Sequence, residues 1–212
     1  MKAIDMKHHP ADRVIVLDFE TTGLSPNQGD RAIEIGAVRI DNGQISERFQ
    51  RLMNPGRRIN GFIENYTGIT NQMLEDAASC EEVMDEFADF IQGYNLVAHN
   101  ASFDSKFLDS ELARIQRNED ALFACSMLIS RRIYQNAPNH KLASLVHYKQ
   151  LPTEGTFHRA LADAEMTALL WLTILEDLRT EYAIHTADFA LMQKLGKVTK
   201  KSVNQFLQQQ NS

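Results

Sequence analysis

Apolar residues in the first quarter of the chain are arranged as they are in β-strands. Residues 13–19 (RVIVLDF) form a nearly continuous apolar run, which is typical of a strand buried on both faces. Residues 31–40 (RAIEIGAVRI) predict a second strand, and residues 44–53 (QISERFQRLM) alternate as a third. Between these two, Asp41-Asn42-Gly43 is a hairpin signal. Because the connections are short, we expect the three strands to form an antiparallel meander.

Beyond the third strand the apolar period becomes helical. Ser79 and Glu82 match a capping box at the start of a helix that ends near Gly93. Residues 95–100 (NLVAHN) begin as a short buried strand and lead into a helix over residues 102–117. This order of strand and helix favours a parallel arrangement for the later strands.

The last part of the chain is mainly helical. Residues 123–129 (FACSMLI) fit a final short strand that passes into a helix, residues 140–148 fit a short helix, and residues 159–179 fit a long one. A meander followed by strand–helix alternation predicts an α/β fold, with one mixed sheet flanked by helices. We expect one domain over residues 1–179 and a C-terminal helical tail of unknown role over residues 180–212.

Composition places the chain among globular proteins. Of its 212 residues, 43% are hydrophobic and 24% are charged, which is ordinary for a protein with a packed core. The apolar runs are shorter than the about 20 residues of a membrane span, and the first residues lack the apolar segment of a signal peptide. Two cysteines, Cys80 and Cys125, are too few for a disulfide framework. We therefore expect a cytoplasmic protein with reduced thiols and no membrane partner.

The net charge of −6 argues against a protein that grips long duplexes through a basic face. It does not exclude nucleic acid as a ligand, however. Acidic residues that bind metal ions become locally positive once the ions are bound.

Carboxylates follow two of the predicted strands and begin the long helix. Asp18 and Glu20 share one face of the first strand, where two neighbouring anions disfavour each other's ionisation. Asp104 is expected in the first turn of the helix after the strand 95–98, and ligand sites in open α/β sheets lie beyond the carboxyl ends of strands. Asp163 lies among Ala and Leu residues of the long helix, where a buried charge must be paired or bind a metal ion.

Together these carboxylates predict an all-oxygen metal site. Such ligands suit Mg²⁺ or Mn²⁺, and two ions about 3.5–4 Å apart can stabilise the attacking and leaving oxygens of a phosphoryl displacement. His158 lies about one helical turn before Asp163, so we expect it to act as the general base on the attacking water, because histidine titrates close to neutral pH. Each feature alone is common in proteins; their order and spacing carry the prediction.

The same residues resemble the motifs of the DEDDh-type 3′→5′ exonucleases, a family that includes the proofreading epsilon subunit of bacterial DNA polymerase III, ribonuclease T and oligoribonuclease. Three motifs occur in the family's order: LDFETTGL (17–24), HNASFD (99–104) and HRALAD (158–163). AIEIGAVRI (32–40) and YTGITNQML (66–74) are supporting matches, and the resemblance extends over about residues 12–178. The spacing of His158 and Asp163 assigns the branch that uses His rather than Tyr.

The resemblance implies a ribonuclease-H-like fold, two divalent ions and release of nucleoside 5′-monophosphates from a 3′ end. It implies that Asp18 bridges both ions and that Glu20 and Asp163 complete one metal site. Asp104 would support the second ion through water.

The resemblance also assigns residues near the carboxylates to substrate binding. The pocket for the terminal nucleotide would be lined by Thr21, Thr22, Gly23 and Leu24. Residues of the second motif would buttress that motif or contact substrate, namely His99, Asn100 and Phe103. For Phe103, its place on the apolar stripe of its helix favours core packing.

We expect the substrate to be the 3′ end of single-stranded nucleic acid, with DNA favoured. Three alternatives stay open: an exoribonuclease that acts on short RNA, a nuclease-like module that docks on a polymerase, and a two-metal phosphomonoesterase, which has no motif support. A DNA polymerase or another replication or repair protein is the expected kind of protein partner. The oligomeric state is open.

Overall fold

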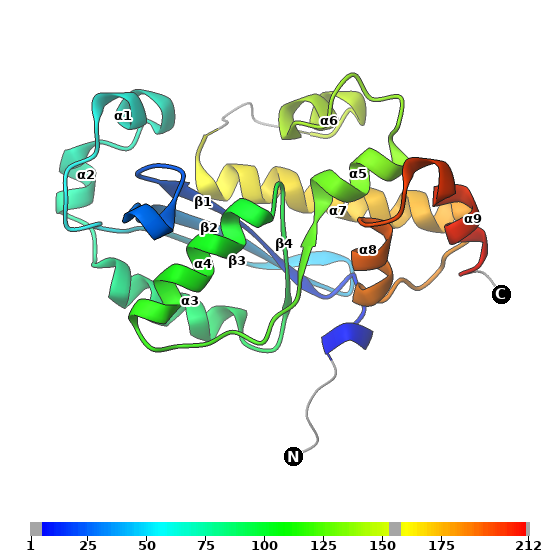
Figure 1. Ribbon diagram of the computed structural model, residues 1–212, viewed down its shortest axis with the longest axis horizontal. Helices are drawn as coiled ribbons and strands as arrows, with labels where there is room; N and C mark the ends of the chain where they lie inside the picture. Colours follow the sequence, from blue (N-terminus) through cyan, green and yellow to red (C-terminus); the bar gives the residue numbers. More distant parts are fainter. Residues whose placement is uncertain (1–5, 153–157, 211–212) are drawn as a thin grey trace, which may run out of the picture.

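The computed structural model describes residues 6–152 and 158–210 (Figure 1). Across these residues, five strands form one sheet in the order β3-β2-β1-β4-β5. The strands are β1 (Val14–Thr21), β2 (Ala32–Asp41), β3 (Gln44–Leu52), β4 (Asn95–Ala98) and β5 (Phe123–Cys125). The pairs β1–β2 and β2–β3 are antiparallel, whereas β1–β4 and β4–β5 are parallel. The predicted meander and the mixed α/β sheet are therefore confirmed.

Helices cover both faces of the sheet (Figure 1). The described α-helices are α1 (Gly61–Thr67), α2 (Asn71–Glu75), α3 (Cys80–Ile91), α4 (Ser102–Arg114), α5 (Ser126–Ile133), α6 (Leu142–Tyr148), α7 (Ala160–Tyr182), α8 (Phe189–Leu195) and α9 (Val203–Gln208). Short 3₁₀ helices are η1 (Met6–His8), η2 (Pro26–Gln28) and η3 (Lys200–Ser202). Among the described helices, none combines enough length with enough apolar character for a membrane span.

No helix or strand was predicted for residues 61–75, where the structure has α1 and α2. Both helices begin with a side-chain cap: Asn60 accepts a hydrogen bond from the Ile63 N–H, and Thr70 accepts one from the Met73 N–H. These caps were visible in the sequence as helix-start signals. They were missed because helices of seven and five residues are too short to show an apolar period.

Strand β1 separates two hydrophobic clusters, one on each face of the sheet. Val14 and Val16 belong to the cluster that contains residues of α7 and α8, whereas Ile15 belongs to the cluster that contains residues of α3 and α4. Side chains alternate along a strand. Asp18 and Glu20 therefore continue the series of Val14 and Val16 and face α7.

The C-terminal segment packs on the same cluster as α7. Phe189 and Leu195 of α8, together with Val203 and Leu207 of α9, are buried there. The boundary at residue 179 between a domain and a tail stays a prediction.

Gly36 allows α7 to approach the sheet directly beside Asp18. It is the cross-strand partner of Asp18 in β2, so both residues face α7. A Cβ atom at Gly36 would lie 2.1 Å from the Leu161 nitrogen and 2.2 Å from the Ala160 carbonyl carbon. The first turn of α7 therefore rests on the sheet where no side chain fits, next to the strand position that carries Asp18.

We predict that Gly36→Ala lowers the free energy of unfolding by about 1–3 kcal/mol, the usual cost of overpacking. The obstructing atoms are backbone atoms and cannot rotate away. Denaturant unfolding measures the change. Gly61→Ala is the matched control, because a Cβ atom at Gly61 would meet nothing within 4 Å; we expect its stability to stay within about 0.5 kcal/mol of the wild type. Equal stability of Gly36→Ala and the wild type would contradict this close packing.

Candidate active site

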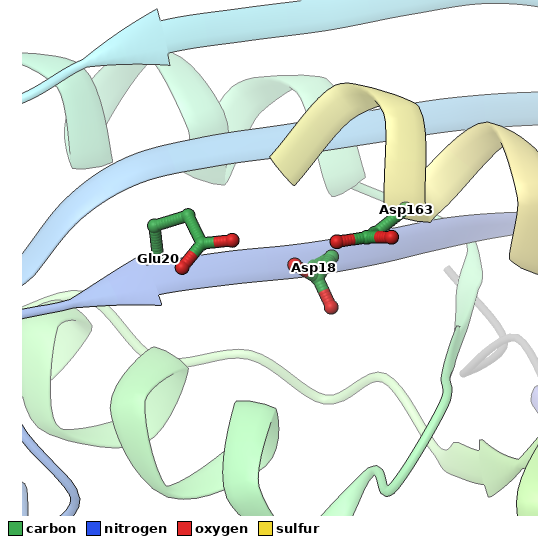
Figure 2. A group of neighbouring side chains, drawn as sticks. All are labelled: Asp18, Glu20 and Asp163. Atoms are coloured by element: carbon green, nitrogen blue, oxygen red, sulfur yellow. The ribbon is translucent and has the colours of Figure 1, made fainter. Parts of the chain in front are cut away.

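Three carboxylates from two elements meet at the carboxyl end of β1. Asp18 and Glu20 come from β1, and Asp163 comes from the first turn of α7. Each offers one oxygen, and these oxygens all lie within 4.8 Å of one another. Figure 2 shows the Asp163 side chain pointing from the helix toward Asp18, with Glu20 farther along the strand. The structure thus brings together three of the four carboxylates that the sequence singled out.

Asp104 is buried beside this cluster but makes a different contact. Its side chain is in the first turn of α4, and its Oδ1 accepts a hydrogen bond of 3.2 Å from the Phe19 N–H. Strand β4 pairs with β1 only as far as Val16, so Asp104 supplies an acceptor where the neighbouring strand no longer does. Among the described residues, the group of mutually close carboxylates contains Asp18, Glu20 and Asp163 but not Asp104.

Burial and mutual repulsion raise the pKa values of these carboxyl groups. Burial, followed by the charge of Asp163, raises the pKa of Glu20 to about 8. The pKa of Asp18 is raised well above its usual range by burial and then by the charge of Asp104. Burial also raises the pKa of Asp163, and it raises that of Asp104 to about 7. The group therefore retains protons near neutral pH unless a cation compensates its charge.

His158 lies just before α7 and is held at both its backbone and its ring. Its N–H donates a hydrogen bond of 3.0 Å to Oδ2 of Asp163, and its backbone φ is +67°. The centroid of its ring lies 4.1 Å from that of Tyr66 on α1. The side chain of His158 remains exposed. This places an accessible imidazole next to the carboxylate cluster.

An aromatic pair on α1 borders the same region and was not foreseen from the sequence. Phe62 and Tyr66 stack with their ring centroids 5.9 Å apart, and their exposed fractions are 72% and 50%. Burial and then the charge of Glu20 raise the pKa of Tyr66. The signal that could have found this pair is its i, i+4 spacing behind the Asn60 cap.

The segment predicted to line a nucleotide pocket comprises the last residue of β1 and the turn that follows it. The Thr21 hydroxyl donates to the Gly23 carbonyl at 2.6 Å, and the Thr22 hydroxyl accepts a hydrogen bond of 2.7 Å from Arg57. Leu24 is 84% exposed. A large apolar side chain that is exposed beside a polar cluster is available for contact with a ligand.

The predicted substrate residues of the second motif differ in their surroundings. His99 donates from Nε2 to the His140 carbonyl at 2.9 Å, and its Nδ1 lies 2.9 Å from the Ser126 hydroxyl. Burial lowers the pKa of His99 to about 4, so its ring is neutral at neutral pH. Phe103 is half-buried against the cluster of α3 and α4, in agreement with core packing. Asn100 is exposed, with a backbone φ of +77°.

Comparison with known proteins identifies the family. The family model described as "Exonuclease" (RNase T) matches residues 15–171. The 3′-5′ exonuclease DinG of Bacillus subtilis (strain 168) is 42% identical over 168 residues, which are 79% of this chain and 18% of that protein. A PolC-type DNA polymerase III of Thermotoga maritima is 41% identical over 170 residues, which are 76% of this chain and 12% of that protein. The chain therefore spans less than a fifth of the length of these relatives.

Solved structures share the fold at lower sequence identity. Exonuclease X in complex with 5′ overhanging duplex DNA has a TM-score of 0.68 at 24% identity, with 86% of this chain and 99% of that chain covered. The nuclease domain of 3′hExo, a DEDDh family member bound to rAMP, has a TM-score of 0.67 at 21% identity, with 78% and 92% covered. Since the family model extends over most of the sheet and α7, the chain belongs to the RNase T exonuclease family.

Proposed function

We propose that this chain is a metal-dependent 3′→5′ exonuclease that releases nucleoside 5′-monophosphates from the 3′ end of single-stranded nucleic acid. The observation that carries the proposal is the group formed by Asp18, Glu20 and Asp163, whose oxygens lie within 4.8 Å of one another. Membership of an exonuclease family supports the same chemistry.

The donor atoms fit Mg²⁺ or Mn²⁺. All of them are carboxylate oxygens, the ligands preferred by hard divalent cations, and their pKa values are raised although Arg159 lowers that of Glu20 and His158 lowers that of Asp163. Asp18, Glu20 and Asp163 would hold the ions, with Asp104 supporting the second ion through water. When bound, two divalent ions stabilise the charge on the attacking and leaving oxygens of the phosphodiester.

The protein's own groups would handle the proton and the nucleotide. His158 has an exposed imidazole beside the cluster and takes the proton of the attacking water as general base. Thr21, Thr22, Gly23 and Leu24 form the pocket for the terminal nucleotide. Phe62 and Tyr66 offer stacked rings on which unpaired bases can lie, and such stacking does not depend on a basic surface. This combination suits an acidic protein that acts on a strand end.

We infer that DNA is the preferred substrate. The relatives named above include a PolC-type DNA polymerase III, and exonuclease X was solved with DNA. The second candidate is short RNA, which is favoured by the structural likeness to a nuclease domain bound to rAMP. Because the chain spans 12% of the polymerase, association with a polymerase is also a proposal, and so is a docking role with little turnover. The cytoplasmic location stays a prediction.

We predict that the protein shortens 5′-labelled single-stranded DNA one nucleotide at a time in Mg²⁺ or Mn²⁺, and that it releases labelled mononucleotide first from a 3′-labelled strand. Gel analysis of both substrates, with RNA of the same sequence alongside, measures polarity and sugar preference. EDTA should stop the reaction. Asp18→Asn should lower the rate by about 10³-fold or more, because the bound ions supply several kcal/mol of transition-state stabilisation. Absence of metal-dependent hydrolysis of both substrates would refute the proposed function, and faster hydrolysis of RNA would overturn the DNA preference.

For His158→Ala we predict a fall in kcat of about 10²–10⁴-fold, the usual contribution of a general base. The metal concentration for half-maximal activity should stay unchanged, because His158 supplies no metal-binding atom in this scheme. Steady-state kinetics with a single-stranded oligonucleotide measure both. His185→Ala is the control, since His185 is also exposed but follows the C-terminal end of α7. A loss confined to KM would contradict the role of general base.

Protons and metal ions should compete for the carboxylate cluster. The pKa of Glu20 is raised to about 8 in the folded protein, so its stabilising contribution is complete below its unfolded pKa of about 4.3 and is lost as pH rises through about 8. We predict that the thermal midpoint in EDTA falls between about pH 5 and about pH 9, and that Mg²⁺ or Mn²⁺ raises it most at the higher pH.

Asp163→Asn is the matched variant for this titration. It should raise the metal-free midpoint at about pH 9, because one repelling charge is removed, and it should abolish most of the stabilisation by metal. The difference in thermal midpoint between the wild type and Asp163→Asn separates the effect of the cluster from that of the other titrating groups. A wild-type midpoint that rises with pH relative to that of Asp163→Asn would contradict the assignment.

A further inference from the structure

Glu34 is a fully buried carboxylate on β2 that the metal site does not explain. It is the cross-strand partner of Glu20, and it therefore lies on the face of the sheet that carries the metal ligands. Its charge adds to the repulsion within the cluster. The pKa of Glu20 is raised by burial, then by the charge of Asp163, and then by the charge of Glu34. A buried charge at such a position needs a strong local partner.

The oxygens of Glu34 are already occupied by donors of the protein. Its Oε1 accepts hydrogen bonds from Arg159 Nη2 at 2.8 Å and from Gln50 Nε2 at 2.9 Å. Its Oε2 accepts from Arg159 Nε at 3.1 Å and from the Ala160 N–H at 3.0 Å. Two carboxylate oxygens offer about four acceptor sites, so these donors saturate them. Glu34 therefore acts on the start of α7 and is not a further metal ligand.

The start of α7 has no cap of its own. Arg159 is the N-cap residue, and its side chain makes no capping hydrogen bond within the helix. The first N–H groups of a helix need acceptors, and a negative charge is favourable at that end. Glu34 supplies both from a neighbouring strand, because it binds the Ala160 N–H and the guanidinium of Arg159 together.

The residues fixed in this way lie between the two functional groups of the third motif. His158 precedes Arg159 directly, and the Asp163 N–H donates to the Arg159 carbonyl at 3.0 Å. A shift of Arg159 would therefore move the general base and the metal ligand together. The bidentate geometry of an Arg–carboxylate pair restricts such shifts more than a single contact would.

Stability alone is a poor explanation for this pair. A buried ion pair often adds little net stability compared with apolar residues of similar size. Another ion pair on α7, between Arg48 and Glu165, already links the helix to β3 and is exposed. In the Glu34–Arg159 pair the carboxylate is fully buried, and it lies opposite Glu20 at the level of the proposed metal ligands.

We propose that Glu34 and Arg159 are positioning residues of the nuclease site, which hold the first turn of α7 so that Asp163 meets Asp18 and Glu20 and His158 faces the scissile bond. The proposal rests on the exonuclease function proposed above. It adds a residue pair that acts through Asp163 and His158 rather than on the ions.

The test is Glu34→Gln, which keeps the size of the side chain but removes its charge and one acceptor oxygen. We expect kcat on a single-stranded oligonucleotide to fall about 10²-fold, the effect of a misplacement of about 1 Å in a catalytic group. The Mn²⁺ concentration for half-maximal activity should rise about tenfold, as is usual when support of a metal ligand is lost. The KM for the oligonucleotide should change by less than about threefold, because the contacts that bind the substrate equally in the ground state and the transition state are not affected.

Arg159→Lys keeps the test decisive if Glu34→Gln folds poorly, and a double variant tests whether the two residues act together. Arg159→Lys retains the positive charge at a half-exposed position but loses the bidentate contact, so we expect the same two changes at about tenfold each. In the double variant Glu34→Gln/Arg159→Lys, kcat should fall no further than in the worse single variant, because the two residues act as one unit. Glu165→Gln is the matched control and should leave kcat and the Mn²⁺ requirement unchanged.

Circular dichroism and thermal unfolding of each variant separate the two possible roles. A purely structural role predicts a lower thermal midpoint with wild-type kcat and metal requirement per folded molecule, and that result would overturn the proposal. If the wild type itself lacks metal-dependent hydrolysis, the proposed function fails instead. Wild-type activity together with unchanged kinetics in Glu34→Gln and Arg159→Lys refutes only the positioning role.

Discussion

The packing of the first turn of α7 on Gly36 is the constraint on which the site depends. It brings Asp163 to a strand that already carries Asp18 and Glu20 on the same face. Three neighbouring carboxylates repel one another, since each disfavours the ionisation of the others. The hydrophobic clusters on both faces of the sheet, together with the buried Glu34–Arg159 pair, oppose that repulsion. The fold therefore holds mutually repelling carboxylates at one place, and a bound cation would reduce that repulsion.

The side chains around the cluster suit the proposed binding of the 3′ end of a nucleic acid. Apolar and aromatic side chains are exposed beside it, Leu24 from the turn after β1 and the stacked Phe62 and Tyr66 from α1. These groups can contact sugars and bases without positive charge, which is consistent with a chain whose net charge is −6. The chain matches a small part of much longer relatives, among them a DNA polymerase.

Much of the fold could be predicted because the core elements carry strong local signals. The apolar run of β1, the turn at residues 41–43 and the capping box of Ser79 all correspond to elements in the structure. The helices α1 and α2 could not be found by periodicity, because each is too short to show one, and β1 continues two residues beyond the predicted end to include Thr21. Asp104 was expected among the metal ligands; in the structure its Oδ1 accepts a hydrogen bond from the Phe19 N–H, and its role at the second ion stays a prediction.

The sequence by itself determined which residues are candidates for the site, because the order of Asp18, Glu20, Asp104, His158 and Asp163 and their places on strands and helices follow from local patterns. Only the tertiary structure decided how close these groups come and what holds them there. The role of Glu34 depends on its pairing with Glu20 on the neighbouring strand β1 and with Arg159 at a separation of 125 residues. The absence of a side chain at Gly36 matters only because α7 lies above it. Distances of this kind arise from packing between segments that are far apart in the sequence, so local sequence patterns do not predict them.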